Sequence, residues 1–392
     1  MESLCSVLKT AGYKVGKFIS PYLTKFNEYI QINDEQIADE DVVRYIEILK
    51  PLIAQAGDKG WEVKYWEVLT AMAFMHFAKN KVDIAIIEVG VGGTWDCTNV
   101  ITPLVSIITK THYDHRELVG HTLEQIAQHD AGIIKAGVPV VTSNFSTALK
   151  VIEKRARELK SPVVRVMAKD VETSNYRLVQ PMSVKYKFRE YHTALKGRHQ
   201  GVNLALVIEA IDILKNENFT ITDEHIKQGL ANVIHRARFE ILSKKPLVIF
   251  DGAHNPDSVR VFMQMVDDYV PPKLRYRIYI FSILKSKDIE MIMEEFSKRL
   301  GRNSEIIFTS GTSDEFYSGK ELQNAFLKFD KKQNVVPNKE NWTIRWGHSE
   351  TWVMDFDAAL AMTKDIRRPL DQTAFFVIGS FKTYKEVLSC LR

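Results

Sequence analysis

Short runs of apolar residues alternate along this chain with stretches in which apolar residues recur every three or four positions. Near-continuous apolar runs are typical of strands buried on both faces of a parallel sheet, and the longer recurrence is typical of amphipathic helices. The runs predict strands at residues 13–19, 82–87, 104–108, 138–141, 247–250, 277–283, 305–309 and 374–378. The recurrence predicts helices at residues 4–11, 41–56, 65–78, 202–215 and 258–266. Strands that alternate with helices predict βαβ units and an α/β fold with a parallel sheet.

The pattern changes twice along the chain and so predicts two domains. Between residues 163 and 191 the segments become short and alternating, which is typical of antiparallel strands. After Lys244-Lys245-Pro246 the buried-strand pattern begins again. We therefore expect one domain at residues 1–243 and a second at 244–392, in line with about 150 residues per domain.

Composition and charge narrow the class of protein. The chain of 392 residues is 45% hydrophobic and 26% charged, as in an ordinary globular protein. A net charge of +4 is too weak to indicate nucleic acid as a partner, but it suits anionic small molecules. No apolar run approaches the ~18 residues of a membrane span, so no membrane partner is expected.

Cysteine spacing and the N-terminal residues bear on the cellular compartment. The three cysteines, Cys5, Cys97 and Cys390, lie far apart, which argues against a disulfide framework and a cysteine-built zinc site and favours a reducing compartment. The first residues show neither the basic region nor the apolar region of a signal peptide. The sequence therefore predicts a cytoplasmic protein.

Polar residues that directly follow predicted strands are the first candidates for chemistry, because ligands of open α/β sheets bind beyond the carboxyl ends of the strands. Glu88 begins the glycine-rich segment 88–93, where a carboxylate is suited to Mg²⁺ and glycines let a ligand approach the backbone. The alternative is a glycine-rich turn with a solvated glutamate. His115 ends the segment 111–115, which is suited to metal binding or proton exchange. The alternative there is a hydrogen-bonded loop.

Two further candidates lie at predicted helix starts. Gly197, His199, Gln200 and Asn203 are suited to binding an anion or a base edge at a helix N-terminus, and an N-cap cluster is the alternative. Residues 251–258 contain Asp251 and His254 at a strand end, and ordinary capping ahead of Pro256 is the alternative.

Taken together and in order, these segments resemble the folylpolyglutamate synthase/dihydrofolate synthase family, a branch of the Mur ligases. The resemblance covers essentially the whole chain. Each motif is weak alone, but so many in one order are highly specific. The matching segments are 11–16, Ser20-Pro21, 26–28, 66–71, 88–90, Gly92-Gly93, Asp96, 98–100, Asp114-His115, 131–135, Gly197, His199-Gln200, Asn203, 238–240, 251–256 and Gly379-Ser380.

The resemblance implies a P-loop-type ATPase domain followed by a smaller C-terminal Rossmann-like α/β domain. It implies ATP and Mg²⁺ as cofactors, with folate or dihydropteroate and L-glutamate as the other substrates. ATP would phosphorylate a folate carboxylate to an acyl phosphate, and the amino group of glutamate would then attack it to form an amide. We expect the protein to be a monomer that binds neither nucleic acid nor membranes.

Roles follow from the resemblance residue by residue. Glu88, His115 and Ser20 match Mg²⁺ ligands, Asn203 a contact to the base, and Arg238 a contact to the phosphates of ATP. Asp251 matches a further position near the nucleotide, and His254 lies beside it in the same motif. Glu88, His115, Asp130 and His254 are the expected catalytic group.

Asp130 stands where the family usually has a carbamylated lysine. Its side chain is shorter than that modified lysine, so we expect it to act through a bridging water or a shifted ion. The alternative is that it caps residues 131–134.

The family's phosphate loop marks the main departure. No GxxxxGK[ST] occurs within the 392 residues, the usual GGRLD is Gly-Gly-Thr-Trp-Asp, and the usual WPGRFE is His-Arg-Ala-Arg-Phe-Glu. The first expectation is a ligase whose recorded sequence begins at an internal methionine. One alternative is a catalytically inactive relative that binds folate or nucleotide, and another is a Mur-type amino acid ligase with a different acceptor.

Overall fold

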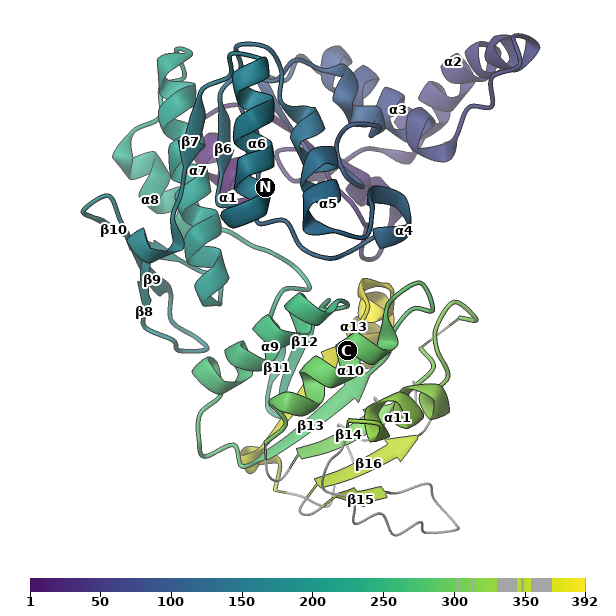
Figure 1. Ribbon diagram of the computed structural model, residues 1–392, viewed down its shortest axis with the longest axis vertical. Helices are drawn as coiled ribbons and strands as arrows, with labels where there is room; N and C mark the ends of the chain where they lie inside the picture. The colour runs from purple at the N-terminus through teal and green to yellow at the C-terminus, as the bar shows by residue number, and fades with distance from the viewer. Residues whose placement is uncertain (302–303, 312, 330–343, 347–348, 354–368, 392) are drawn as a thin grey trace. The chain divides into compact units, whose positions relative to one another are not determined.

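The computed structural model describes residues 1–301, 304–311, 313–329, 344–346, 349–353 and 369–391 (Figure 1). The chain divides into two compact units, Met1–Asn175 with Pro181–Ile234, and Tyr176–Gln180 with His235–Arg392. The division precedes residue 243 because strand β11 (Glu240–Lys244) pairs with strand β12 (Leu247–Asp251) and so belongs to the second unit. None of the helices within the described residues is long and apolar enough to cross a membrane.

The first unit contains three small sheets in the described residues. One has the order β3-β2-β1-β4, one the order β5-β6-β7, and one the order β10-β9-β8. The strands are β1 (Val15–Phe18), β2 (Ile30–Ile32), β3 (Glu35–Gln36), β4 (Ile84–Ile87), β5 (Ser106–Ile108), β6 (Val140–Thr142), β7 (Val163–Arg165), β8 (Glu172–Ser174), β9 (Met182–Tyr186) and β10 (Arg189–Thr193). The helices are α1 (Glu2–Thr10), α2 (Asp39–Asp58), α3 (Tyr65–Lys79), α4 (Arg116–Val119), α5 (Leu123–Asp130), α6 (Ser146–Glu158), α7 (Arg198–Asn216) and α8 (Asp223–Ala231).

Strands β1 and β4 run parallel and position the residues that follow them. Phe18 pairs with Ile87 at their carboxyl ends. The apolar run at 82–87 predicts a strand buried on both faces, but β4 is the edge strand of its sheet and its Ala85 is exposed. The prediction of a strand was correct and that of full burial was wrong, because side-chain pattern does not report how many neighbours a strand has.

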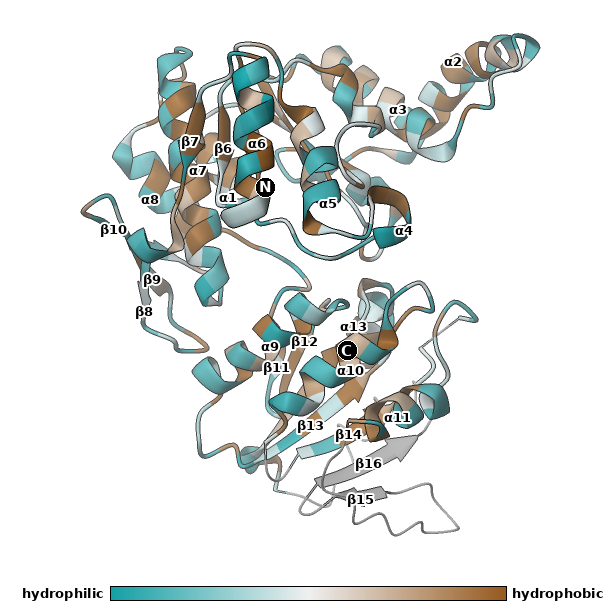
Figure 2. Cartoon of the chain, in the orientation of Figure 1, coloured by the Kyte–Doolittle hydropathy of each residue, from teal (hydrophilic) through white to brown (hydrophobic). Residues whose placement is uncertain are grey.

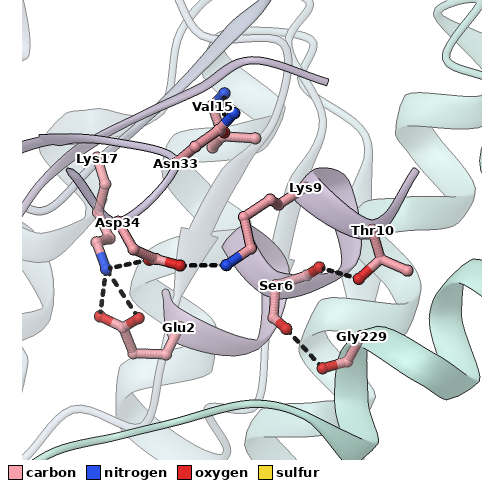
Figure 3. A network of polar contacts seen from close by, with 9 residues as sticks. All are labelled: Glu2, Ser6, Lys9, Thr10, Val15, Lys17, Asn33, Asp34 and Gly229. Atoms are coloured by element: carbon pink, nitrogen blue, oxygen red, sulfur yellow. Dashed lines mark hydrogen bonds and ion pairs between the residues drawn. The ribbon is translucent and has the colours of Figure 1, made fainter. Parts of the chain in front are cut away.

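Charged residues attach helix α1 to this sheet (Figure 3). Lys17 of β1 has a buried side chain, and its ammonium nitrogen lies 3.0 Å from the carboxylate of Glu2 and 3.2 Å from that of Asp34. Burial is the largest single influence and lowers the pKa of Lys17, but the negative charges of Glu2 and Asp34 together with the hydrogen bond to Glu2 and the neighbouring Cys5 outweigh it, so the pKa is raised. On the other side of α1, the Ser6 hydroxyl donates to the carbonyl of Gly229 in α8 at 2.7 Å. Polar contacts thus hold α1 between the sheet and α8.

Helix α7 begins earlier than its sequence predicts. The apolar spacing places the helix start near residue 202, yet the helix runs from Arg198. A Cβ at position 201 would lie 2.4 Å from Cγ2 of Thr173, so the glycine is present because β8 packs closely against the helix. Asn203 therefore lies in the second turn and not at the N-terminus, which corrects its expected place.

The second unit is built on one sheet of seven strands within the described residues, in the order β11-β12-β17-β13-β14-β16-β15. Its pairings from β12 through β17, β13 and β14 to β16 are parallel. The remaining strands are β13 (Tyr276–Phe281), β14 (Ser304–Phe308), β15 (Ile344–Trp346), β16 (Ser349–Val353) and β17 (Thr373–Ile378). The helices are α9 (Pro256–Tyr269), α10 (Ile289–Lys298), α11 (Gly319–Leu327) and α13 (Tyr384–Leu391).

Helices cover both faces of this sheet and bury its central strands. Figure 1 shows α9, α10 and α11 across one face, and their apolar residues form a core cluster with Ile249 and Phe376. The next residue along β12, Phe250, points to the opposite face and packs on Tyr384 of α13. Figure 2 shows the same layering, with hydrophobic strands and helices whose outer sides are hydrophilic. Every residue of β12 and β17 is buried, as the apolar runs predict.

Candidate functional site

Ser20 and Glu88 lie together just beyond the ends of β1 and β4. The backbone amide of Ser20 donates to Oε2 of Glu88 at 2.9 Å, and the amide of Glu88 donates to the carbonyl of Phe18 at 2.9 Å. The parallel register of the two strands brings about this meeting, because both carboxyl ends then reach the same edge. The structure thus brings together two of the three predicted magnesium ligands.

A small cleft of ≈ 20 Å³, room for about one water, opens beside this pair. Trp66 on its wall is 44% exposed and packs edge-to-face on Tyr29 and Tyr65. The cleft therefore combines a carboxylate, hydroxyls and an accessible aromatic ring. Its lining residues are Phe18, Ile19, Ser20, Trp66, Thr70, Glu88, Gly90, Asp96, Cys97 and Thr98.

Asp96 fixes the loop that carries Glu88. One carboxylate oxygen of Asp96 accepts from the amides of Gly90 and Val91 at 3.0 and 3.3 Å, and the other accepts from the amide of Thr98 at 2.9 Å. A single side chain therefore closes the glycine-rich turn onto the short 3₁₀ helix Cys97–Val100. This role of Asp96 was not predicted from the sequence, although the position of Asp96 between the glycines and the Thr98-Asn99 pair was a signal for it.

The same loop packs on the end of helix α5, next to Asp130. The Thr94 amide donates to the carbonyl of His129 at 3.0 Å, and a Cβ at Gly93 would lie 2.7 Å from that carbonyl oxygen. Asp130 accepts from the Thr111 hydroxyl at 2.8 Å, and burial raises the pKa of its carboxyl group. Its side chain makes no capping hydrogen bond to residues 131–133, so the capping alternative is wrong. Asp130 instead ties α5 to the loop after β5.

His115 lies at the start of α4, in the loop after β5. Its backbone has the left-handed φ of 47°, and its amide donates to Oδ1 of Asp114 at 2.9 Å. A Cβ at Gly92 would lie 3.0 Å from Val119 of α4, so α4 packs on the loop that follows Glu88. Within the described part of the chain, no three His, Cys, Asp or Glu side chains are grouped to hold a metal ion. A shared ion at Glu88 and His115 stays a prediction.

The donors at Ser20 and Glu88 nevertheless suit Mg²⁺. Mg²⁺ prefers hard oxygen ligands and is commonly held by one or two carboxylates, with water and substrate phosphate completing its shell. A carboxylate beside a hydroxyl residue at the mouth of a cleft meets that requirement. Burial and the neighbouring carboxylate of Asp96 raise the pKa of the Cys97 thiol on the wall of the same cleft.

In the second unit, Asp251 and Arg238 meet at the carboxyl end of β12. The Asp251 carboxylate is buried and accepts from the amides of Phe239 and Ala253 at 2.8 and 2.9 Å. Burial raises its pKa, and the positive charge of Arg238 opposes that rise. Asp251 thus fixes the backbone next to Arg238, and Arg238 is an exposed residue.

His254 follows in the loop before α9. Its Nδ1 lies 2.7 Å from the carbonyl oxygen of Gly252, which accepts only, so Nδ1 carries a proton. Its ring contacts Phe381 at 5.6 Å between centroids, and the Arg238 guanidinium carbon lies 4.5 Å from the same ring centroid. The three predicted residues of the second unit therefore converge on one another. Phe381 was missed, although the Gly379-Ser380 pair before it had been noted.

Asn203 belongs to the first unit. Its side-chain amide donates to Oε1 of Gln200 at 3.2 Å, one turn earlier in α7. Gly197 is the N-cap residue of α7, and the N-cap cluster given as the alternative stays a prediction. A contact from Asn203 to a nucleotide base stays a prediction.

Comparisons with known proteins first define the class. Residues 237–367 match the family model described as Mur ligase, glutamate ligase domain. A folylpolyglutamate synthase from Thermotoga maritima aligns in structure with a TM-score of 0.78 and 28% identity, covering 100% of this chain and 85% of that one. A complex of such a synthase with AMPPCP aligns at TM-score 0.75 and 27% identity, covering 98% and 86%. The chain is thus a two-domain ligase of the Mur type.

A curated relative defines the family within that class. The dihydrofolate synthase/folylpolyglutamate synthase of Bacillus subtilis is 34% identical over 376 residues, which is 93% of this chain and 86% of the relative. The chain belongs to the dihydrofolate synthase/folylpolyglutamate synthase family and is, as a member, an ATP-dependent acid–amino acid ligase. The resemblance seen in the sequence, the fold class and the ligase function are confirmed.

Proposed function

We propose that this chain joins L-glutamate to the carboxylate of a folate or dihydropteroate with ATP, and that the acid substrate lies over the exposed surface around the mouth of the cleft beside Glu88, because the cleft itself has room for about one water. The observation that carries the proposal is the pairing of Ser20 with Glu88 beside the exposed ring of Trp66. A flat heteroaromatic ring is well matched to a tryptophan face. The named activity of the Bacillus subtilis relative supports this substrate class.

Each predicted site residue has a separate role in the proposed reaction. Ser20 and Glu88, with His115, would hold Mg²⁺, which when bound neutralises charge that builds up on transferring phosphate. Arg238 presents a guanidinium suited to the phosphates of ATP. ATP then transfers its γ-phosphoryl group to a carboxylate oxygen of the acid and leaves as ADP. The glutamate nitrogen attacks the acyl carbon, loses a proton, and phosphate departs as the amide forms.

The cleft itself is preorganised by hydrogen bonds from backbone amides to the carboxylates around it. Asp96 fixes the glycine loop, and the Ser20 amide orients the Glu88 carboxylate. Preorganised groups of this kind save the reorganisation that a flexible site would need. We further propose that the protein works as a monomer in the cytoplasm. Sedimentation equilibrium at micromolar concentration tests the first of these two points, and a dimer would refute it.

The test is release of ADP by the full chain, with Mg²⁺, that depends on both L-glutamate and dihydropteroate or tetrahydrofolate. We expect Glu88→Gln to lower kcat by about 100-fold, because it keeps an acceptor for the Ser20 amide but removes the charge. Glu172→Gln, on an exposed position of β8, is the matched control and is expected to leave kcat unchanged.

Two other results would overturn the proposal. Binding of nucleotide or folate without any release of ADP would favour the inactive relative. Release of ADP with another acid, and not with a pteroate, would favour the Mur-type ligase with a different acceptor.

A further inference from the structure

Phe381 occupies a place in the second unit where three separate segments meet. It begins a short 3₁₀ helix, Phe381–Thr383, directly after β17. The Ser380 hydroxyl accepts from the amide of Lys382 at 3.2 Å, and the Thr383 hydroxyl donates to the carbonyl of Ser380 at 3.0 Å. The backbone that carries the ring is therefore fixed by its own turn.

The ring lies directly against the backbone that follows β12. A Cβ at Gly252 would lie 1.9 Å from Cε1 of Phe381 and 2.3 Å from Cδ1 and Cζ. No side chain fits between them, so glycine at 252 is required by the ring. Because Gly252 also accepts from His254, the ring is held next to both Gly252 and His254.

The backbone on each side of Arg238 is fixed by the same strand end. The amide of Gly252 donates to the carbonyl of Ala237 at 2.9 Å, and the amide of Phe239 donates to Asp251 at 2.8 Å. Ala237 and Phe239 both have left-handed φ values, 56° and 46°. Non-glycine residues keep such values only where their surroundings impose them, so this backbone is imposed by Asp251 and Gly252.

The side chain of Arg238 has a different support. Its guanidinium carbon lies 4.5 Å from the centroid of the Phe381 ring, within the range in which an aromatic face attracts a cation. An exposed arginine otherwise samples many rotamers, and ordering it has an entropic cost. The ring offers one preferred position at the carboxyl ends of β12 and β17.

We propose that Phe381 is a positioning residue that holds the Arg238 guanidinium ready for the phosphates of a nucleoside triphosphate. The proposal rests on the proposed function, in which Arg238 binds those phosphates. Phe381 itself touches no reacting atom; it reduces the disorder that binding would otherwise have to remove. Loss of the aromatic face should therefore weaken nucleotide binding only while Arg238 is present.

The experiment uses the full chain and AMPPCP with Mg²⁺, with Kd measured by calorimetry. Phe381→Leu removes the aromatic face but keeps an apolar side chain, and we expect Kd to rise about two- to fivefold. Phe381→Tyr keeps the face and should bind as the unmodified chain does. Phe329→Leu is the matched control, a half-buried phenylalanine of the same unit that packs on the core cluster.

A double substitution separates positioning from general damage. In an Arg238→Ala background, Phe381→Leu should change Kd no further. An equal weakening with and without Arg238, or no weakening in Phe381→Leu alone, would overturn the proposal.

A spectroscopic readout tests the contact without any nucleotide. The δ-methylene protons of Arg238 should be shifted upfield by the ring in the unmodified chain and in Phe381→Tyr, and not in Phe381→Leu. Identical shifts in all three would overturn the contact. If the unmodified chain binds no AMPPCP, the proposed function fails, and these shifts alone decide whether Phe381 holds Arg238.

Discussion

Replacing Gly252 with alanine should displace the Phe381 ring and destabilise the second unit. The added Cβ would lie 1.9 Å from Cε1 of the ring. An ordinary carbon–carbon contact is about 3.5 Å, so the ring must retreat by roughly 1.6 Å. The φ of Gly252 lies outside the left-handed region, so alanine adds a clash without backbone strain. Overpacking of this kind costs about 1–3 kcal/mol, and three ring atoms within 2.3 Å place Gly252→Ala at the upper end of that range.

The assay is urea unfolding followed by circular dichroism, combined with a double-mutant cycle. Phe381→Ala empties the space that the new methyl group needs. The double variant should therefore be more stable than the sum of the two single changes predicts, by at least about 2 kcal/mol. Gly301→Ala is the control in the same unit, because a Cβ there meets nothing closer than 3.9 Å. Additive effects in the double variant would refute the reasoning, since they would show that the ring does not lie against position 252.

Three further predictions follow from buried groups. Glu2→Gln should lower the free energy of unfolding by about 2 kcal/mol at pH 7, because the buried ammonium of Lys17 loses its nearest carboxylate. The pKa of Lys17 is raised in the folded chain, so this stabilisation is present at neutral pH and is lost as the pH rises through the folded-state pKa. An unchanged urea midpoint would contradict this prediction. Asp130→Asn should raise the free energy of unfolding at pH 7, because burial raises the pKa of Asp130 and so disfavours its charged form, and the variant should lose that advantage below about pH 4. If Asp130 only joins Thr111 to α5, the same variant should keep the Mg²⁺ dependence of the activity. Burial raises the pKa of Cys5 to about 12. At pH 8 this thiol should therefore react with Ellman's reagent only at the rate of unfolding. Cys5→Ala should leave the fast phase of labelling unchanged.

The strands show how far pattern alone reaches. The apolar runs at 247–250 and 374–378 predict strands buried on both faces, and both lie inside the central sheet of the second unit. The run at 82–87 has the same pattern but forms an edge strand. Hydrophobic pattern reports what a side chain prefers, whereas burial also depends on how many neighbours surround the strand.

Some features of the candidate site can likewise be predicted from the sequence, and others cannot. Glu88 could be named from the sequence because it follows a predicted strand, whereas Ser20 was named only from the resemblance to the family. The structure brings the two together because parallel strands bring their carboxyl ends to one edge. The hydrogen bonds from the glycine-loop amides to Asp96 could in principle be predicted from the sequence, because they join residues close together in the chain.

The amino-acid sequence by itself determined the family, the order of most strands and helices, and the residue types available for chemistry. It did so because these depend on local periodicity and on motifs in a fixed order. The tertiary structure alone decided that Phe381 supports Arg238, that Gly201 lies inside a helix, and that Asp130 bonds Thr111. Each of these depends on close approach between segments distant in the chain, and packing of that kind leaves no periodic signal in the sequence.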